Sequence, residues 1–219
     1  FAYSNLQSVT LPANVRFVGQ YAFYHTQISS VQFAADSKLE KLEQYAFANN
    51  DNLTAVTLPA SLSDIGTYAF YGSALTSLDF ADGFAMSAIP AYAFADTKLT
   101  SVTIPDSVNY IDDDAFRDCA DLTSVKFGSA SDLQLHANAF YNTGLFGTLD
   151  IPANVRYIGE YSLVGLQNLQ AYNVDAANPY YKSVDGVLYT ADGKKLIAFP
   201  AGRTGSFVVP AWVETIGFG

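Results

Sequence analysis

The chain has 219 residues, of which 50% are hydrophobic and 15% are charged, a composition that excludes an intrinsically disordered chain. Its net charge of −10, from 21 acidic and 11 basic residues, argues against a nucleic-acid partner, because a phosphate backbone is held by clustered Lys and Arg. The single cysteine, Cys119, excludes an internal disulfide and a cysteine-based zinc site. No apolar run approaches the roughly 20 residues needed to cross a bilayer, so we expect no membrane insertion within this segment.

The pattern Leu-x-x-Val-x-Leu, with conservative variations, returns eight times along the chain at intervals of 22 to 25 residues. Its central residue falls at Val9, Val31, Val56, Leu78, Val102, Val125, Leu149 and Tyr172. A fixed period in the twenties predicts a solenoid, in which stacked units cover each other's apolar faces.

Residues 53–70 illustrate one unit. The alternation around Val56 predicts a short strand with Val56 and Leu58 facing inward. Pro59 is expected to end the pairing of this strand, because proline has no N–H. Leu62 and Ile65 should then return to the core on the way round.

The end of each unit carries a small residue followed by a large one. Gly66 is expected to permit a tight bend before this pair. The pair recurs as Ala22-Phe23, Ala46-Phe47, Ala69-Phe70, Ala93-Phe94, Ala115-Phe116 and Ala139-Phe140, and becomes Ser162-Leu163 in the following unit. Stacking of the units should align these rings into a buried phenylalanine column that serves as a packing spine.

A second period, of 46 to 47 residues, is superimposed on the first. Prolines follow every second strand, at Pro12, Pro59, Pro105 and Pro152. The strands between them end at Phe33, Phe80, Phe127 and Val174. Two unit types therefore alternate, one compact and one with a looser return, and the length variation of the loose units should lie in loops on one side of the array.

The repeat pattern breaks after residue 174. Residues 178–200 predict a β-hairpin, in which residues 187–189 pair with residues 196–199 across a loop containing Asp192 and Gly193. A compact unit then resumes at residues 207–217. We expect one solenoid domain with a repeat array at 1–177, a β-hairpin insertion at 178–205 and the start of the next repeat at 206–219.

The segment IPDSVNYIDDDAFRDC at residues 104–119 resembles the unit of the BspA-like leucine-rich repeat family, although Asp112 stands where that family has glycine. The sequence Ser-x-Asp-Gly-Val-Leu-Tyr at 183–189 is similar to an insertion in the same family. The resemblance implies a leucine-rich-repeat-like right-handed coil with a parallel β-sheet, short turns and few short helical segments. Members occur on surface proteins of bacteria and some protists, so a secreted or cell-surface location is implied, with any leader or anchor outside this segment.

No catalytic, cofactor or metal site is expected. The position of Cys119 is filled in other units by the small polar residues Ser4, Thr26, Asn50, Ser73, Thr97 and Thr143, which predicts local hydrogen bonding rather than a nucleophile. His25 and His136 occupy non-equivalent places. The three consecutive carboxylates of residues 112–114 should diverge, which favours a solvated acidic turn over a cation site.

The exposed side of the parallel sheet is the candidate binding face, because residues that flank the central apolar residue should project outward. One flanking column is Ser8, Ser30, Ala55, Ser77, Ser101, Ser124, Thr148 and Ala171. The other is Thr10, Gln32, Thr57, Asp79, Thr103, Lys126, Asp150 and Asn173. The competing interpretation is a bland, solvated sheet. Lys126 and Asp150 lie on adjacent units, and a pair between them would contribute only about 0–1 kcal/mol.

These observations favour a non-enzymatic protein–protein interaction or adhesion module of a secreted or cell-surface bacterial protein. Its expected partners are host or bacterial surface proteins, with glycans as a further class. Two alternatives remain open at this point. The array could be a structural spacer, or a substrate-holding accessory module of a larger surface enzyme.

Overall fold

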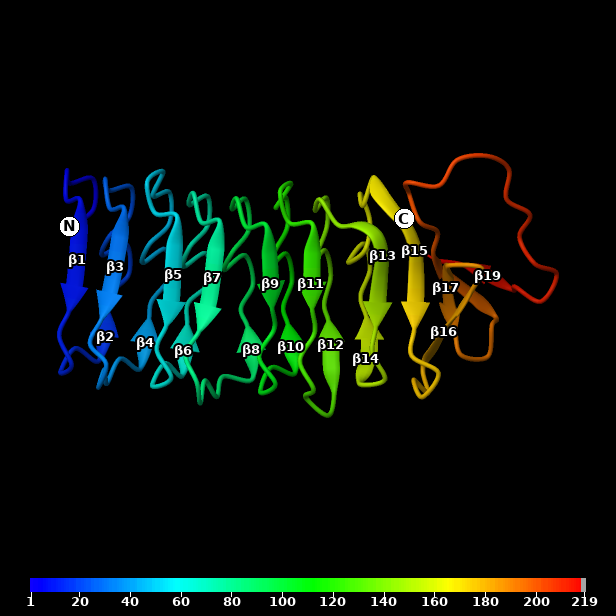
Figure 1. The fold of residues 1–219 in the computed structure, drawn as a ribbon, viewed down its shortest axis with the longest axis horizontal. Helices are drawn as coiled ribbons and strands as arrows, with labels where there is room; N and C mark the ends of the chain where they lie inside the picture. The colour runs from blue at the N-terminus through cyan, green and yellow to red at the C-terminus, as the bar shows by residue number, and fades with distance from the viewer. Residues whose placement is uncertain (218–219) are drawn as a thin grey trace.

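The computed structural model describes residues 1–217, which form an elongated parallel β-solenoid (Figure 1). Each turn is here called a rung. The first seven rungs contribute one strand to the front of the solenoid and one to the rear, and the eighth contributes the front strand β15 alone. The front strands are β1 (Ser8–Leu11), β3 (Ser30–Phe33), β5 (Ala55–Leu58), β7 (Ser77–Phe80), β9 (Ser101–Thr103), β11 (Ser124–Lys126), β13 (Phe146–Ile151) and β15 (Asn168–Val174). The rear strands are β2 (Phe17–Val18), β4 (Lys41–Leu42), β6 (Asp64–Ile65), β8 (Ala88–Ile89), β10 (Tyr110–Ile111), β12 (Leu133–Leu135) and β14 (Val155–Ile158).

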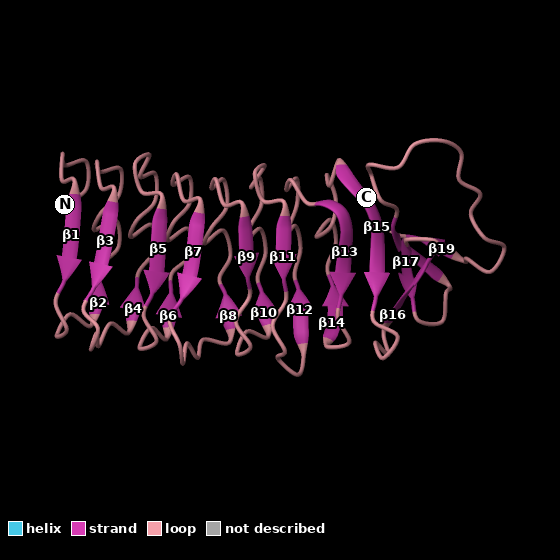
Figure 2. Cartoon of the chain, viewed as in Figure 1, coloured by secondary structure: helices cyan, strands magenta, loops and turns pink. Residues whose placement is uncertain are grey.

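Residues 1–217 contain no helix (Figure 2), so the expectation of a few short helical segments is wrong. The return segments form the rear strands instead. In β10, Tyr110 faces out while Ile111 is buried, and both pair in register with Ala88 and Ile89 of the rung before. Aromatic and β-branched residues suit such a half-buried strand.

The front strands confirm the predicted inward and outward alternation. Val56 and Leu58 are buried while Thr57 between them is exposed. Parallel pairing keeps equivalent residues opposite each other, as in Val56 with Leu78. Leu62 and Ile65 also reach the core as predicted.

The front strands are paired two by two, β1 with β3, β5 with β7, β9 with β11 and β13 with β15, which is the structural form of the double period. The residue after a loose-unit strand donates its N–H to the rung before, as Ala34 does to the Leu11 carbonyl (3.2 Å) and Ala81 to the Leu58 carbonyl (2.9 Å). The compact units carry proline at this position, Pro59 after β5 for example. Because proline has no N–H, that bond cannot form and the pairing stops after every second rung.

The rear sheet is interrupted once, between the three strands β2-β4-β6 and the four strands β8-β10-β12-β14. Elsewhere the residue after a rear strand donates to the preceding rung, as Gly66 N does to the Leu42 carbonyl (2.7 Å) and Asp112 N to the Ile89 carbonyl (2.9 Å). Pro90 occupies this position after β8 and cannot donate. This rear break lies behind the intact front pair β5–β7, so the front and rear breaks fall between different rungs.

The predicted phenylalanine column is confirmed and runs through seven rungs. Ring centroids of successive members lie 5.0–5.7 Å apart, with nearly parallel planes. The members are Phe1, Phe23, Phe47, Phe70, Phe94, Phe116 and Phe140. A main-chain ladder accompanies the rings, as in the bond from Phe47 N to the Ala69 carbonyl (2.8 Å).

The position three residues after Phe is buried and hydrogen-bonded in six units, as predicted, but not at Ser4, whose hydroxyl has no partner within residues 1–217. The Ser73 hydroxyl donates to the Phe70 carbonyl (2.7 Å), and the Thr97 hydroxyl to the Phe94 carbonyl (2.9 Å). These bonds give each buried hydroxyl an acceptor within its own closing turn.

The bend at Gly66 has a different cause from the one expected. Its φ is not in the left-handed region, but a Cβ there would lie 2.4 Å from the backbone nitrogen of Gln44 in the preceding rung. Gly66 is therefore required by the close approach of two rungs.

The insertion forms the predicted hairpin and one further strand. β17 (Val187–Thr190) pairs antiparallel with β18 (Lys195–Ala198) across the turn at Asp192 and Gly193. β16 (Tyr181–Val184) adds a third antiparallel strand that the sequence analysis missed, and β19 (Thr215–Ile216) pairs parallel with β18.

In the last unit, residues 207–209 form no strand, although a front strand was expected there. The last two expected residues of the unit, 218–219, lie outside the described residues.

Candidate binding surface

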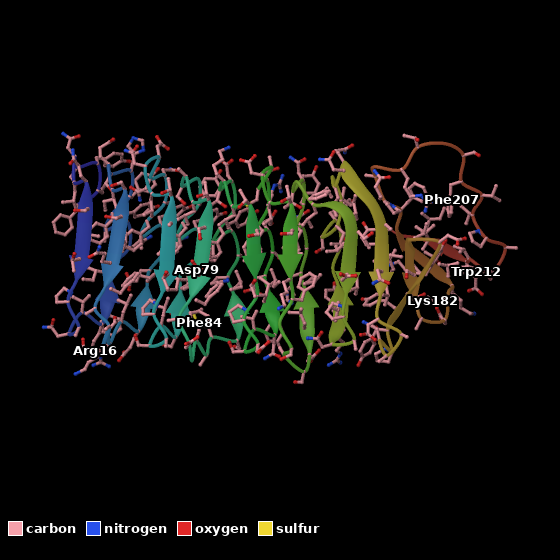
Figure 3. All side chains as sticks on the ribbon, in the orientation of Figure 1. Arg16, Asp79, Phe84, Lys182, Phe207 and Trp212 are labelled. Atoms are coloured by element: carbon pink, nitrogen blue, oxygen red, sulfur yellow. The ribbon has the colours of Figure 1, made fainter. Side chains whose placement is uncertain are left out.

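All eight residues of the outward column are exposed on the front sheet: Thr10, Gln32, Thr57, Asp79, Thr103, Lys126, Asp150 and Asn173. Each alternates with an apolar neighbour that faces the core, so the sheet pleat alone positions them. Asp79 lies near the middle of this face, on β7 (Figure 3). The first flanking column is also exposed or half-buried along its length.

Hydrogen bonding within the outward column is sparse. Asp150 accepts a bond from the Asn173 amide (2.7 Å), and Asp79 accepts a long one from Ser77 (3.3 Å). Lys126 and Asp150 do not form the pair that their adjacent units would allow, because no ion pair joins them among the described residues. Their strands, β11 and β13, lie on either side of a front break.

Lys126 acts on Asp106 instead, which lies in the loop after β9. The Ser129 N–H donates to the Asp106 carboxylate (2.8 Å), and this bond is the main cause that lowers the pKa of Asp106. The positive charge of Lys126 lowers the same pKa further as a smaller cause. Asp106 is thus held as a carboxylate and already has partners.

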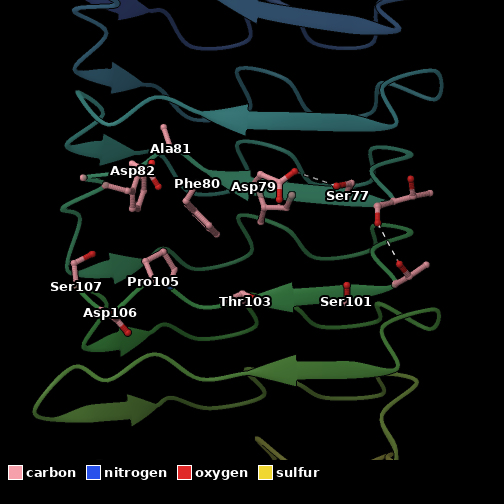
Figure 4. Close-up of a pocket in the computed structure, with 15 residues that line it drawn as sticks. Ser77, Asp79, Phe80, Ala81, Asp82, Ser101, Thr103, Pro105, Asp106 and Ser107 are labelled. Carbon is pink, nitrogen blue, oxygen red and sulfur yellow. Dashed lines mark hydrogen bonds between the residues drawn. The ribbon is translucent and has the colours of Figure 1, made fainter. Parts of the chain in front are cut away.

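Two open grooves lie along the front breaks. The first has a volume of about 510 Å³ and lies between β7 and β9 (Figure 4). Its walls include Asp79, Phe80 and Asp82 on one side and Thr103 and Asp106 on the other. We call it the acidic groove.

The second groove, here the sister groove, has a volume of about 800 Å³ and lies between β3 and β5. It is one double unit away, and its lining repeats that of the acidic groove: Phe33 corresponds to Phe80, and Thr57 to Thr103. The charges differ. Gln32, Ala35 and Ala60 stand where the acidic groove has Asp79, Asp82 and Asp106.

A row of stacked tyrosines follows the closing turns outside the phenylalanine column. Tyr21, Tyr45, Tyr68 and Tyr92 stack with centroid separations of 4.8, 4.8 and 4.5 Å. Burial is the main cause that raises the pKa of Tyr92 to about 12. The ring faces cover one another, so this row presents ring edges and hydroxyls rather than a platform for stacking a ligand.

Cys119 does not have the environment of a nucleophile. Its side chain is fully buried, and Sγ lies 3.1 Å from the Phe94 carbonyl and 3.2 Å from the Thr97 hydroxyl. Burial raises the pKa of the thiol to about 11, so it stays protonated at neutral pH and donates a hydrogen bond.

The carboxylates of residues 112–114 divide between two sites: Asp112 and Asp113 lie 3.9 and 4.0 Å from His136, whereas Asp114 faces Arg117. Asp114 is buried and pairs with Arg117 (3.0 Å), which corrects the expectation of a fully solvated acidic turn. Asp113 accepts the N–H of Ala137 (3.0 Å), while burial raises the pKa of Asp112 beside His136. No group of three potential metal-binding side chains occurs in residues 1–217.

The grooves and the tyrosine row were missed by the sequence reasoning. The row could have been found from the tyrosine that precedes Ala-Phe in four units. The grooves had a weaker signal in the loose units, whose returns begin at Phe33 and Phe80 and rim the front breaks.

The part of the chain described here also contains no helix that could span a membrane.

The BspA type Leucine rich repeat region matches the chain in six copies, over residues 1–86 and 87–183. Among solved structures, the pneumococcal vaccine antigen PcpA superposes with a TM-score of 0.74 at 23% identity, over 96% of this chain and 51% of that one. A leucine rich cell surface protein from Faecalibacterium prausnitzii gives a TM-score of 0.65 at 25% identity, over 95% and 59%. A leucine-rich repeat protein from Eubacterium ventriosum gives 0.54 at 23% identity, over 87% and 44%.

The chain thus spans about half the length of these solved structures. No curated protein sequence matches it. The family match is consistent with a solenoid that works as an interaction module, and the solved structures share its fold.

Proposed function

Because the chain belongs to the BspA type leucine-rich repeat family, we propose that it is a non-enzymatic adhesion module of a secreted or cell-surface bacterial protein. Its front face would bind proteins on host or bacterial surfaces. The observation that carries this proposal is the outward column, in which eight successive rungs expose a polar side chain that the core does not need. A solenoid uses such a row as an extended binding surface.

The chemistry of the described residues supports a binding role over a catalytic one. The only thiol is buried and protonated, Asp114 is paired with Arg117, and Asp113 accepts a main-chain N–H from the next rung. By contrast, Gln32, Thr57 and Thr103 on the front face make no side-chain hydrogen bond within residues 1–217, so their polar groups are free for a partner. The similarity to a bacterial cell surface protein supports the proposed location.

The proposal is tested by attachment of the 219-residue chain to immobilised extracellular-matrix proteins and to epithelial cells. Replacing Asp79, Lys126 and Asp150 together with serine should reduce the bound fraction at least about fivefold, because all three charges lie on the binding face. Serine or threonine already occupies the flanking positions of this sheet, so the melting temperature should be unchanged.

A matched control removes the same charges from the rear side, by replacing Lys41, Asp64 and Glu160 with serine. Lys41 and Asp64 form an exposed ion pair (2.9 Å), and pairs of this kind add little to stability, so the fold should be retained. Attachment should survive this change. Attachment that survives the front-face variant but is lost in the rear-face variant would contradict the proposal.

A further inference from the structure

We propose that the acidic groove between β7 and β9 binds an extended segment of a partner protein that carries arginine or lysine side chains. This inference rests on the proposed function and specifies the chemistry of one part of its surface. The acidic groove combines a cavity, an aromatic wall and two unpaired carboxylates on the front face (Figure 4).

The shape of the groove suits a long side chain with an apolar stem. Phe80 points from the end of β7 into the space before the next rung (Figure 4), and its ring packs on Phe84 with centroids 4.7 Å apart. Pro105 and Thr103 form the facing wall. Lysine and arginine lay their methylene stems along such apolar surface while the charged end stays at a polar rim.

The charge of the groove favours a cationic occupant. Asp79 and Asp82 are both exposed, and neither forms an ion pair with any residue in 1–217. Asp106 is already engaged by Ser129, so Asp79 and Asp82 are the two carboxylates free to receive a ligand. Ser101 lines the same groove and adds a neutral hydroxyl beside the charges.

The chain contains its own comparison for this argument. The sister groove has the same break and the same phenylalanine wall, but Gln32 replaces Asp79 and Ala35 replaces Asp82. Asp82 also touches the far rim of the sister groove, so Asp79 is the free carboxylate that distinguishes the two. The common architecture supplies the cavity, and the local residues set its charge preference.

The experiment uses the capped pentapeptide Ser-Arg-Ser-Arg-Ser as its probe. In an extended peptide, alternate side chains project to one side, so both guanidinium groups can face the groove. The peptide is titrated into the ¹⁵N-labelled chain, and amide chemical shifts report where it binds. We expect saturable shifts in residues 77–84 and 101–107, and smaller or no shifts in residues 30–37 and 55–61.

Two double variants exchange the charged and uncharged residues between the two grooves. Asp79→Gln with Asp82→Ala gives the acidic groove the residues of its sister and should weaken peptide binding at least about tenfold. Gln32→Asp with Ala35→Asp makes the reverse exchange and should create saturable shifts in residues 30–37. The control peptide Ser-Gln-Ser-Gln-Ser should bind neither groove, and raising the salt concentration should weaken binding of the arginine peptide.

The proposal is overturned if the arginine peptide leaves residues 77–84 unperturbed, or if it binds the Asp79→Gln, Asp82→Ala variant equally well. It is also overturned if Ca²⁺ shifts these amides while the peptide does not, which would identify a cation site. These outcomes are separate from the adhesion test. Attachment through the front face with no peptide binding would remove only the groove assignment, and peptide binding without attachment would remove only adhesion.

Discussion

Left-handed backbone conformations recur twice in every closing turn of the solenoid. The first position, two residues before the spine residue, is Tyr21, Tyr45, Tyr68, Tyr92, Asp114, Asn138 and Tyr161. The second, two residues after it, is Tyr3, His25, Asn49, Gly72, Asp96, Asp118, Asn142 and Gly165. Asn, Asp and Gly tolerate this region, but a tyrosine there is unusual. At Tyr21, Tyr45, Tyr68 and Tyr92 the rings stack on one another, which helps to offset the unfavourable backbone.

The phenylalanine column gives the sharpest prediction at the residue scale. Phe70 is fully buried between Phe47 and Phe94, so Phe70→Ala removes a ring and leaves a cavity. We expect the free energy of unfolding to fall by about 3–5 kcal/mol in a urea titration. As a control, Phe146→Ala removes a ring that is 61% exposed and should change it by less than about 0.5 kcal/mol. Similar losses in the two variants would contradict a packing role for the column.

At the scale of the strand, single prolines decide where the sheets stop. A strand in this solenoid is continued by the residue that follows it, whose N–H bonds to the rung before. Pro59 and Pro105 withhold that bond at the front, and Pro90 withholds it at the rear. The same residue type therefore produces both grooves and the rear break through one missing donor.

Pro90→Glu tests this explanation. Glu43 occupies the equivalent position in β4's rung and donates to the Val18 carbonyl (2.9 Å). The new N–H at position 90 should bond to the Ile65 carbonyl and join the two rear sheets. Hydrogen exchange by NMR should show that amide protected to a similar degree as the amide of Glu43. Exchange as fast as that of the exposed loop residue Asp36 would show that something other than the missing donor separates β6 from β8.

The sequence predicted the front strands, the spine and the hairpin, because each has a strong local pattern. Val56 and Leu58 alternate with exposed residues, and the Ala-Phe pair returns at a fixed distance. The rear strands were not predicted, since two residues such as Lys41 and Leu42 are too short to show an alternation. The outward column was placed correctly on the exposed face, whereas the grooves were missed. The grooves arise where a proline such as Pro59 cannot donate a hydrogen bond to the preceding rung. This is a relation between two rungs, so it cannot be recognised from the sequence of one unit.

At the scale of the whole molecule, the double unit is the element that should be removable. Deleting residues 59–104 joins Leu58 to Pro105 and removes two rungs in phase with the pairing. We expect a folded protein that is about 10 Å shorter by small-angle scattering, because neighbouring strands lie about 4.8 Å apart. Its stability should fall only by the contribution of the rungs removed, as in other repeat proteins.

A one-rung deletion provides the control. Deleting residues 59–80 joins Leu58 to Ala81, so a compact strand continues into a loose return and the alternation is broken. This variant should melt at a lower temperature than the one lacking two rungs, although it keeps more residues. If the one-rung deletion instead melted at the higher temperature, the rungs would be interchangeable and the double period would have no structural meaning. In a full-length protein, activity that survives the two-rung deletion would support the spacer interpretation over a contact made by those rungs.

The staggering of the proline breaks has a mechanical consequence. Wherever the front strands part, the rear strands of the same two rungs remain paired, as β8 and β10 do behind the acidic groove. If two rungs began to separate at a front break, the hydrogen-bonded rear strands of the same rungs would still hold them together. At each groove, two rungs are unpaired at the front but remain hydrogen-bonded at the rear. We therefore expect the solenoid to bend at these places under load without separating its rungs.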